Sequence, residues 1–96
     1  TTCKDKKEAK KIVDILLKER LAACIQISSI NSFYIWNGEF CKEKEKLLSI
    51  KTKIKHFKKV QRKIKENHSY DVPEIICLKI KKRSKDYKNF IGDNTK

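Results

Sequence analysis

Glycine, proline and arginine are scarce in this sequence of 96 residues. Two glycines and one proline exclude a low-complexity, collagen-like or linker-dominated chain. No apolar run approaches the ~18 residues that a membrane-spanning helix needs, so we expect no membrane segment. We expect a single domain over residues 1–96, with a core so small that association with further copies would stabilise it.

Positive charge is abundant, but nearly all of it comes from lysine. Lysine and arginine together number 25 against 12 acidic residues, which gives a net charge of +13, yet the only arginines are Arg20, Arg62 and Arg83. Nucleic-acid recognition favours arginine, because its planar guanidinium makes paired hydrogen bonds with phosphate and guanine. A lysine-rich solvated surface therefore explains the charge better than a dedicated nucleic-acid site. Weak, salt-sensitive binding to polyanions stays open.

The four cysteines form neither a CxxC motif nor a zinc-finger pair, which argues against a structural zinc site. Residues 1–20 contain no recognisable signal peptide. An even number of cysteines without such a signal indicates a reducing, cytoplasmic location rather than a disulfide framework. Apart from the metal-site alternative considered below, we expect all four to be small buried thiols, at Cys3, Cys24, Cys41 and Cys77.

Apolar residues at helical spacing predict a first helix over residues 6–20. Asp5 is a suitable N-cap, and Glu8 stands where it would complete a capping box. A second helix is expected over residues 56–67. Ser84 can cap a short last helix.

A long antiparallel hairpin is predicted between the first two helices. Its arms run over residues 22–36 and 39–53, and Asn37-Gly38 between them suits a type I′ turn. Ser28-Ser29 interrupts the alternation and predicts a bulge or a bend. A two-stranded ribbon with about a dozen residues in each arm is not stable alone, so we expect an oligomer.

A further strand over residues 74–81 follows the loop 68–73 and completes the predicted order of elements. This order fits an α+β fold, a ferredoxin-like βαββαβ sandwich with a long central hairpin and a short C-terminal helix. That fold needs one more strand before the first helix, of which only residues 1–3 are present.

Five motifs in order resemble the CutA family, the divalent-cation-tolerance proteins. They are ERLAAC at residues 19–24, S-x-Y-x-W-x-G at 32–38, IKT at 50–52, H-x-Y-D-V-P-E-I at 68–75 and D-Y-x-x-F-I at 86–91. The resemblance implies a ferredoxin-like subunit in a PII-like homotrimer whose hairpins pair across subunits. It also implies a part in tolerance to copper and other divalent metals. No reaction is established for the family, so we expect no enzyme.

Cys24, His68 and Cys3 are the candidate metal ligands. Family members linked to copper carry thiols at the position of Cys24 and at or next to that of Cys3. A thiolate and an imidazole suit copper, and zinc less well. The structural alternative is that the thiols pack as small buried groups while His68 hydrogen-bonds to its loop.

A second group of residues gathers, by the family resemblance, around a cleft between subunits. A base, a carboxylate and aromatic rings around such a cleft could bind a small anion or a metal complex. The alternative is packing in the trimer interface, with Lys51 and Glu74 as a structural ion pair. The residues are Tyr34, Trp36, Lys51, Tyr70 and Glu74, close to His68.

The sequence therefore predicts a trimeric, non-catalytic protein that binds divalent metal ions, copper first. Its expected partners are copies of itself and the metal ion. The alternative is a PII-like regulatory module whose trimer binds a protein or a small molecule.

Overall fold

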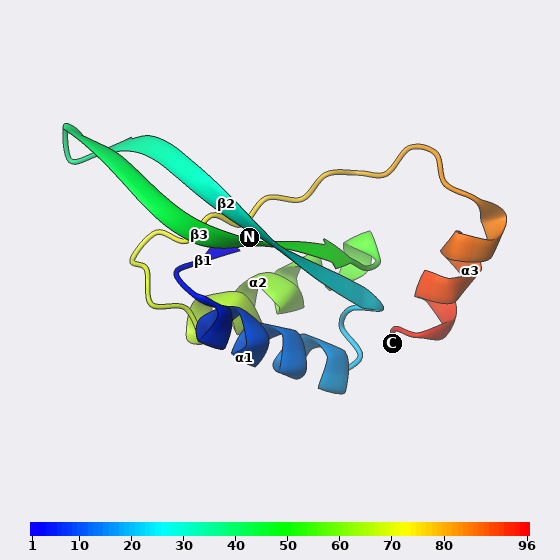
Figure 1. The fold of residues 1–96 in the computed structure, drawn as a ribbon. Helices are drawn as coiled ribbons and strands as arrows, with labels where there is room; N and C mark the ends of the chain where they lie inside the picture. The colour runs from blue at the N-terminus through cyan, green and yellow to red at the C-terminus, as the bar shows by residue number, and fades with distance from the viewer.

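The computed structural model describes residues 1–96 and contains a three-stranded antiparallel sheet with two helices packed on one face (Figure 1). The hairpin projects beyond the helices, and the molecule measures 44 × 26 × 21 Å along its principal axes. None of the helices has the length and apolarity that crossing a bilayer would require. The elements in chain order are β1 (Thr2–Cys3), α1 (Lys6–Lys18), β2 (Cys24–Trp36), β3 (Glu39–Lys51), the 3₁₀ turn η1 (Ile54–His56), α2 (Phe57–Glu66) and α3 (Lys85–Asp93).

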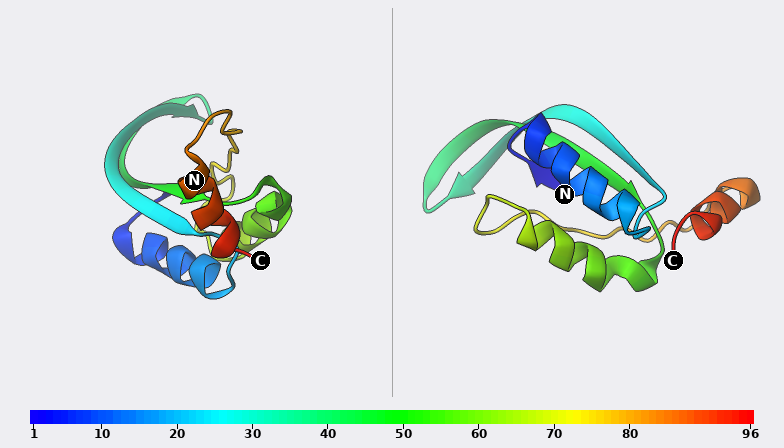
Figure 2. Two further views of the ribbon diagram at one scale, coloured as in Figure 1. Left: turned by 90° about the vertical axis from the view of Figure 1, so that its right-hand side faces the viewer. Right: turned by 90° about the horizontal axis from the view of Figure 1, so that it is seen from below.

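The sheet has the order β1-β3-β2, so β3 lies in the middle. Strands β2 and β3 pair without interruption from Cys24 opposite Lys51 to Trp36 opposite Glu39. The predicted bulge at Ser28-Ser29 is wrong, because both residues keep direct partners in β3. The ribbon instead curls smoothly along its length, as strand twist allows without an extra residue (Figure 2).

Asn37 and Gly38 form the hairpin turn, with φ angles of 51° and 78°. Two positive φ angles are what a type I′ turn requires, so the prediction for Asn-Gly is confirmed. The turn lets both arms reach 13 residues in register.

Helix α1 begins as predicted, with the Asp5 side chain accepting a hydrogen bond of 2.8 Å from the Glu8 backbone N–H. The capping box is not completed, because the Glu8 carboxylate turns inward to His68. The helix ends at Lys18, two residues before the predicted end, and Arg20 adopts a positive φ of 57°. The core lies between the helices and the sheet and is formed by Cys3, Ala9, Ile12, Leu16, Leu21, Ala22, Leu48, Val60 and Ile64.

The C-terminal residues fold back onto the body of the domain. Ser84 caps α3 by accepting a 3.1 Å hydrogen bond from the Tyr87 backbone N–H, as predicted. The Lys96 backbone N–H donates to the Arg20 carbonyl, and the His56 ring contacts the Lys96 carbonyl at 2.8 Å. These contacts place the end of the chain beside the turn that follows α1 (Figure 1).

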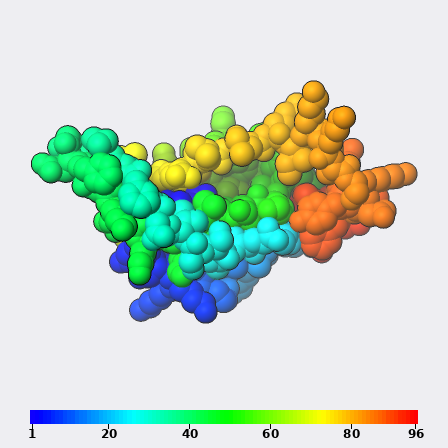
Figure 3. Space-filling view, turned by 45° about the horizontal axis from the view of Figure 1, so that its top comes forward, coloured from blue at the N-terminus to red at the C-terminus, as the bar shows by residue number.

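The strand predicted over residues 74–81 does not form. The segment runs separately along one margin of the molecule and joins no ladder (Figure 3). Strand β1 pairs with β3 at only two positions, so the sheet presents little edge with which this segment can pair. As a result Ile76 and Leu78, expected inside a central strand, are 66% and 82% exposed in the single chain.

Candidate functional site

Cys3, Glu8 and His68 converge beneath the N-terminal end of α1. One ligand atom from each residue lies within 4.8 Å of the others. Cys3 ends β1, Glu8 lies in the first turn of α1, and His68 opens the loop after α2. Cys3 and Glu8 are buried, and the His68 side chain is fully shielded from solvent. Two neighbouring elements at the N-terminal end of the sequence and one distant loop therefore build one enclosed cluster.

The contacts of the His68 ring fix where its proton lies. Nε2 is 2.6 Å from the Thr2 carbonyl oxygen, which can only accept, so Nε2 carries the hydrogen. Nδ1 accepts a 3.1 Å hydrogen bond from the Tyr70 backbone N–H, so its single lone pair is engaged, and a metal ion would bind Nδ1 only by displacing this hydrogen bond. A histidine that donates one N–H to a backbone carbonyl and keeps the other nitrogen unprotonated has the arrangement of a metal ligand.

The Glu8 carboxylate has an unsatisfied oxygen. Its Oε1 is buried without any hydrogen-bond partner and lies 3.4 Å from Nδ1 of His68. Because Nδ1 accepts the hydrogen bond of the Tyr70 N–H, it has no hydrogen to donate to this oxygen. This buried carboxylate oxygen has neither a hydrogen-bond donor nor a positive charge beside it. A bound cation would supply the positive charge.

The third member of the cluster, Cys3, is protonated at neutral pH. Burial, followed by the nearby Glu8 carboxylate, raises the pKa of the Cys3 thiol to about 11. A thiol becomes a metal ligand only as the thiolate, so a metal ion must displace this proton. Together the sulfur, carboxylate oxygen and imidazole nitrogen form a donor set suited to Cu(II) or Zn(II).

Cys24 lies outside this cluster. Cys24 pairs with Lys51 of β3, whereas Thr2, the neighbour of Cys3, pairs with Leu47, four residues earlier in the same strand. Its neighbour is Tyr87 in α3, whose pKa is raised by burial and by the Cys24 thiol. The structure thus brings together two of the three predicted ligands, Cys3 and His68, and adds Glu8. Glu8 lies one helical turn before Ile12 on the buried face of α1. An acidic residue at an apolar position of the helix is the sequence signal that could have identified Glu8 as a site residue.

Four of the five predicted cleft residues line one hollow, which we call the aromatic hollow. It encloses about 540 Å³ between the outer part of the hairpin and the loop after α2. Lys51 is not part of it, because its Nζ donates to Gln26 Oε1 at 3.0 Å, and no ion pair joins it to Glu74. Sequence reasoning missed Glu45, which accepts a 2.7 Å hydrogen bond from the Tyr70 hydroxyl. The lining residues are Thr2, Ser32, Phe33, Tyr34, Trp36, Glu45, Tyr70, Asp71, Val72 and Glu74.

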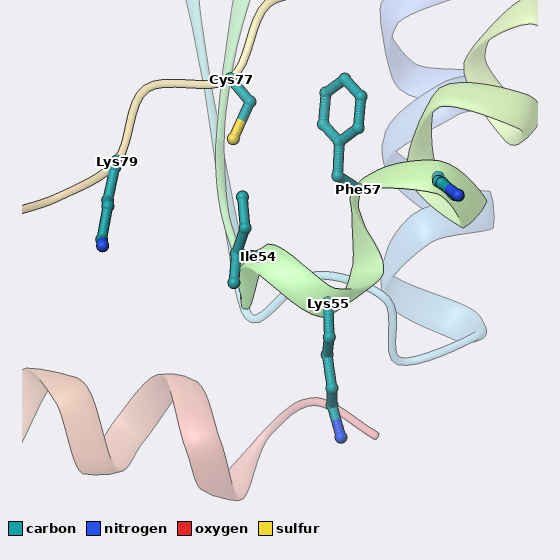
Figure 4. A pocket seen from close by; sticks show the side chains of 6 residues that line it. Ile54, Lys55, Phe57, Cys77 and Lys79 are labelled. Atoms are coloured by element: carbon teal, nitrogen blue, oxygen red, sulfur yellow. The ribbon is translucent and has the colours of Figure 1, made fainter.

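A second, more open hollow of about 480 Å³ lies where the 72–84 segment passes the start of α2 (Figure 4). Cys77 lines it together with Ile54, Phe57 and three lysines. The expectation that Cys41 and Cys77 are buried is wrong, since Cys41 is half-buried and Cys77 is exposed. The reason for Cys77 is the missing strand pairing, which leaves its segment away from the core.

Known proteins similar to this chain identify its family. The family model described as CutA1 divalent ion tolerance protein matches residues 1–94. The divalent-cation tolerance protein CutA of Thermus thermophilus is 39% identical over 91% of this chain and 85% of that protein. A crystal structure of CutA1 from Pyrococcus horikoshii has a TM-score of 0.94 at 36% identity and covers 100% of this chain and 94% of its own. These matches confirm the predicted fold class, and the chain belongs to the CutA1 divalent ion tolerance family.

Proposed function

We propose that this protein binds a divalent metal ion at the cluster of Cys3, Glu8 and His68, and that this binding is its function. The observation that carries the proposal is the buried Oε1 of Glu8, which has no hydrogen-bond partner and lies 3.4 Å from Nδ1 of His68. A metal ion placed between these atoms and the Cys3 sulfur would satisfy the Glu8 oxygen; it would replace the Tyr70 N–H as the partner of Nδ1 and displace the proton of the thiol. The names of the relatives as divalent-cation tolerance proteins agree with this.

Copper is the metal that we assign to the cluster. A site of nitrogen, oxygen and sulfur ligands binds Cu(II) more tightly than Zn(II) in the general order of divalent metals. The ligand atoms lie up to 4.8 Å apart, so small side-chain movements would be needed to reach bond lengths of about 2.0–2.3 Å. The high pKa of Cys3 makes the site selective for ions that compete strongly with the proton.

Assembly into a homotrimer is the second part of the proposal. The outer half of the hairpin exposes large apolar side chains, of which Phe40 is 74% exposed. The 72–84 segment adds Ile76, Leu78 and Ile80, and it pairs with no strand of its own chain. Copies of the same chain are the simplest cover for both surfaces, because the hairpin of one copy can supply the strand partner that the segment of another lacks.

The remaining parts concern catalysis and location. We propose that the protein catalyses no reaction, since the cluster contains no group placed as an activated nucleophile. We also propose a cytoplasmic location, in which the four unpaired cysteines remain reduced. A PII-like regulatory module is the alternative function, and the aromatic hollow is the observation that favours it.

Metal retention distinguishes the two functions. The protein is loaded with Cu(II) under nitrogen, passed through a gel-filtration column and measured by elemental analysis. We expect one copper per chain in the wild type and in Cys24→Ser, and a strong loss in Cys3→Ser and His68→Ala. Equal retention in all four proteins, or none in the wild type, would contradict the metal function.

A further inference from the structure

The loop of residues 68–71 is held in place by side chains alone. None of its backbone groups takes part in a backbone–backbone hydrogen bond. Its ties are the bond between the His68 ring and the Thr2 carbonyl and two hydrogen bonds donated by Tyr70. The residues on either side of Tyr70 are exposed. A segment with so few ties can move separately from the helices and the sheet.

Tyr70 provides two of these three ties. Its backbone N–H donates to Nδ1 of His68 at 3.1 Å, and its hydroxyl donates to the Glu45 carboxylate at 2.7 Å. The rings of Tyr70 and His68 lie against each other, with their centroids 4.8 Å apart. Glu45 belongs to β3, the middle strand, and is only 7% exposed. Tyr70 therefore fastens the loop both to the sheet and to the histidine of the metal cluster.

Nδ1 of His68 can serve only one partner at a time. An unprotonated imidazole nitrogen has one lone pair, so it accepts either the Tyr70 N–H or a metal ion. The ring itself is anchored, because its Nε2–H donates to the Thr2 carbonyl and its side chain is fully shielded from solvent. Turning the ring away would leave a buried N–H without an acceptor, whereas the Tyr70 N–H, with exposed neighbours, can bind water instead. Tyr70, rather than the ring, is the group that gives way.

We propose that residues 69–71 form a latch on the metal site, in which a metal ion at Nδ1 of His68 releases the Tyr70 N–H, and the hold of Tyr70 on Glu45 opposes this release. The latch rests on the metal binding proposed above and assigns the residue that sets its strength. Tyr70 is a positioning residue and not a ligand. The more firmly the latch holds the empty site, the more weakly the site binds metal, because both compete for the same lone pair.

The latch works inside one chain. Every contact of Tyr70 that it uses is with residues of the same subunit, so the covering of neighbouring surfaces by further copies does not remove it. Metal binding and latch release are linked reciprocally, so metal shifts the loop toward its released state by the same factor by which release strengthens metal binding. An occupied subunit therefore differs from an empty one in the loop that leads into the 72–84 segment.

Tyr70→Phe removes the hydroxyl tie and keeps the ring and the backbone N–H. It also leaves the charges of Glu8 and Glu45 in place. The affinity of the full chain for Cu(II) is measured under nitrogen, by competition with a chelator of known affinity. We expect Tyr70→Phe to bind Cu(II) about three- to tenfold more tightly than the wild type, because the loss of one hydrogen bond makes release of the latch easier. Tyr87→Phe on α3 is the matched control and should leave the affinity unchanged.

The direction of the change separates the latch from a merely supporting role. If Tyr70 only held His68 in its binding position, Tyr70→Phe would bind Cu(II) more weakly than the wild type. That result, or an unchanged affinity, would overturn the latch and leave the metal site intact. A wild type that binds no Cu(II) would instead refute the proposed function, and the latch with it.

Amide exchange tests the latch in the wild type, without any substitution. Deuterium uptake is followed by mass spectrometry in peptides that cover residues 68–72, with and without one equivalent of Cu(II). We expect faster uptake in the loaded protein, since the Tyr70 N–H has lost its Nδ1 acceptor. Peptides from α2 serve as the control and should exchange at the same rate in both samples. Equal or slower uptake in the loop of copper-loaded protein would contradict the proposal.

Discussion

Oε1 of Glu8 lies 3.4 Å from Nδ1 of His68, and neither atom has a proton to share with the other. The Thr2 carbonyl holds the histidine proton on Nε2, and the Tyr70 N–H is already directed at Nδ1. The Cys3 thiol lies beside them, and the ligand atoms of the three residues are all within 4.8 Å of one another. This relationship gives the cluster its expected affinity for a metal ion.

Glu8→Gln tests the unsatisfied oxygen. The amide of glutamine is neutral, so the substitution removes the buried carboxylate oxygen that has no partner, and it can place an N–H instead of an oxygen beside Nδ1 of His68. We expect the metal-free variant to be more stable than the wild type by about 1 kcal/mol in chemical unfolding. We also expect Cu(II) to stop raising its Tm. A less stable variant that is still stabilised by Cu(II) would argue against this reading, and Glu66→Gln serves as the surface control.

Stability at high pH depends on Cys3. Its pKa is raised from 9.0 to about 11 in the folded protein, so the folded state disfavours the thiolate. The resulting contribution is fully present below pH 9 and is lost as the pH rises toward 11. We predict that the free energy of unfolding falls over this window and falls less steeply in Cys3→Ser. The same slope in Cys3→Ser and wild type would show that Cys3 does not cause the loss.

Tyr70→Phe tests the link between the loop and the hairpin. The substitution removes the 2.7 Å hydrogen bond from the buried Glu45 carboxylate. We expect a loss of about 1–3 kcal/mol in the free energy of unfolding, because a buried charged acceptor loses its donor. Tyr87→Phe, at a more exposed ring, should cost less than about 1 kcal/mol. Equal effects of the two substitutions would indicate that Glu45 finds another partner.

Leu78→Asp tests the trimer. The side chain is 82% exposed in the single chain, so the substitution should leave the fold of one subunit intact. We expect light scattering to show three chains of 11.4 kDa for the wild type and smaller particles for the variant. Ser69→Asp, in the exposed part of the loop, is the matched control. A wild-type protein that stays a folded single chain at micromolar concentration would refute the assembly.

Local chemistry made much of the fold predictable. Asp5 and Ser84 cap their helices as their side chains allow, and Asn37-Gly38 sets the hairpin turn. The strand expected over residues 74–81 failed because strand formation needs a neighbouring edge, which a segment's own composition cannot supply. The uninterrupted pairing at Ser28-Ser29 likewise depends on the partner residues in β3, which the polarity of the two serines does not reveal.

The site was less predictable than the fold. The family resemblance pointed to Cys3, Cys24 and His68 one by one, but only the folded chain shows that Cys24 lies elsewhere along the sheet. Glu8 was interpreted as a capping residue, because its inward turn depends on where the loop after α2 places His68. Lys51 was grouped with Glu74 by resemblance, whereas within one chain it bonds to Gln26.

X-ray absorption at the copper edge tests the proposed metal site most directly. In protein loaded with one equivalent of copper, we predict one sulfur ligand at about 2.2–2.3 Å together with nitrogen and oxygen ligands. The sulfur signal should vanish in Cys3→Ser and persist in Cys24→Ser. A copper site without sulfur, or one that loses its sulfur in Cys24→Ser instead, would contradict the assignment.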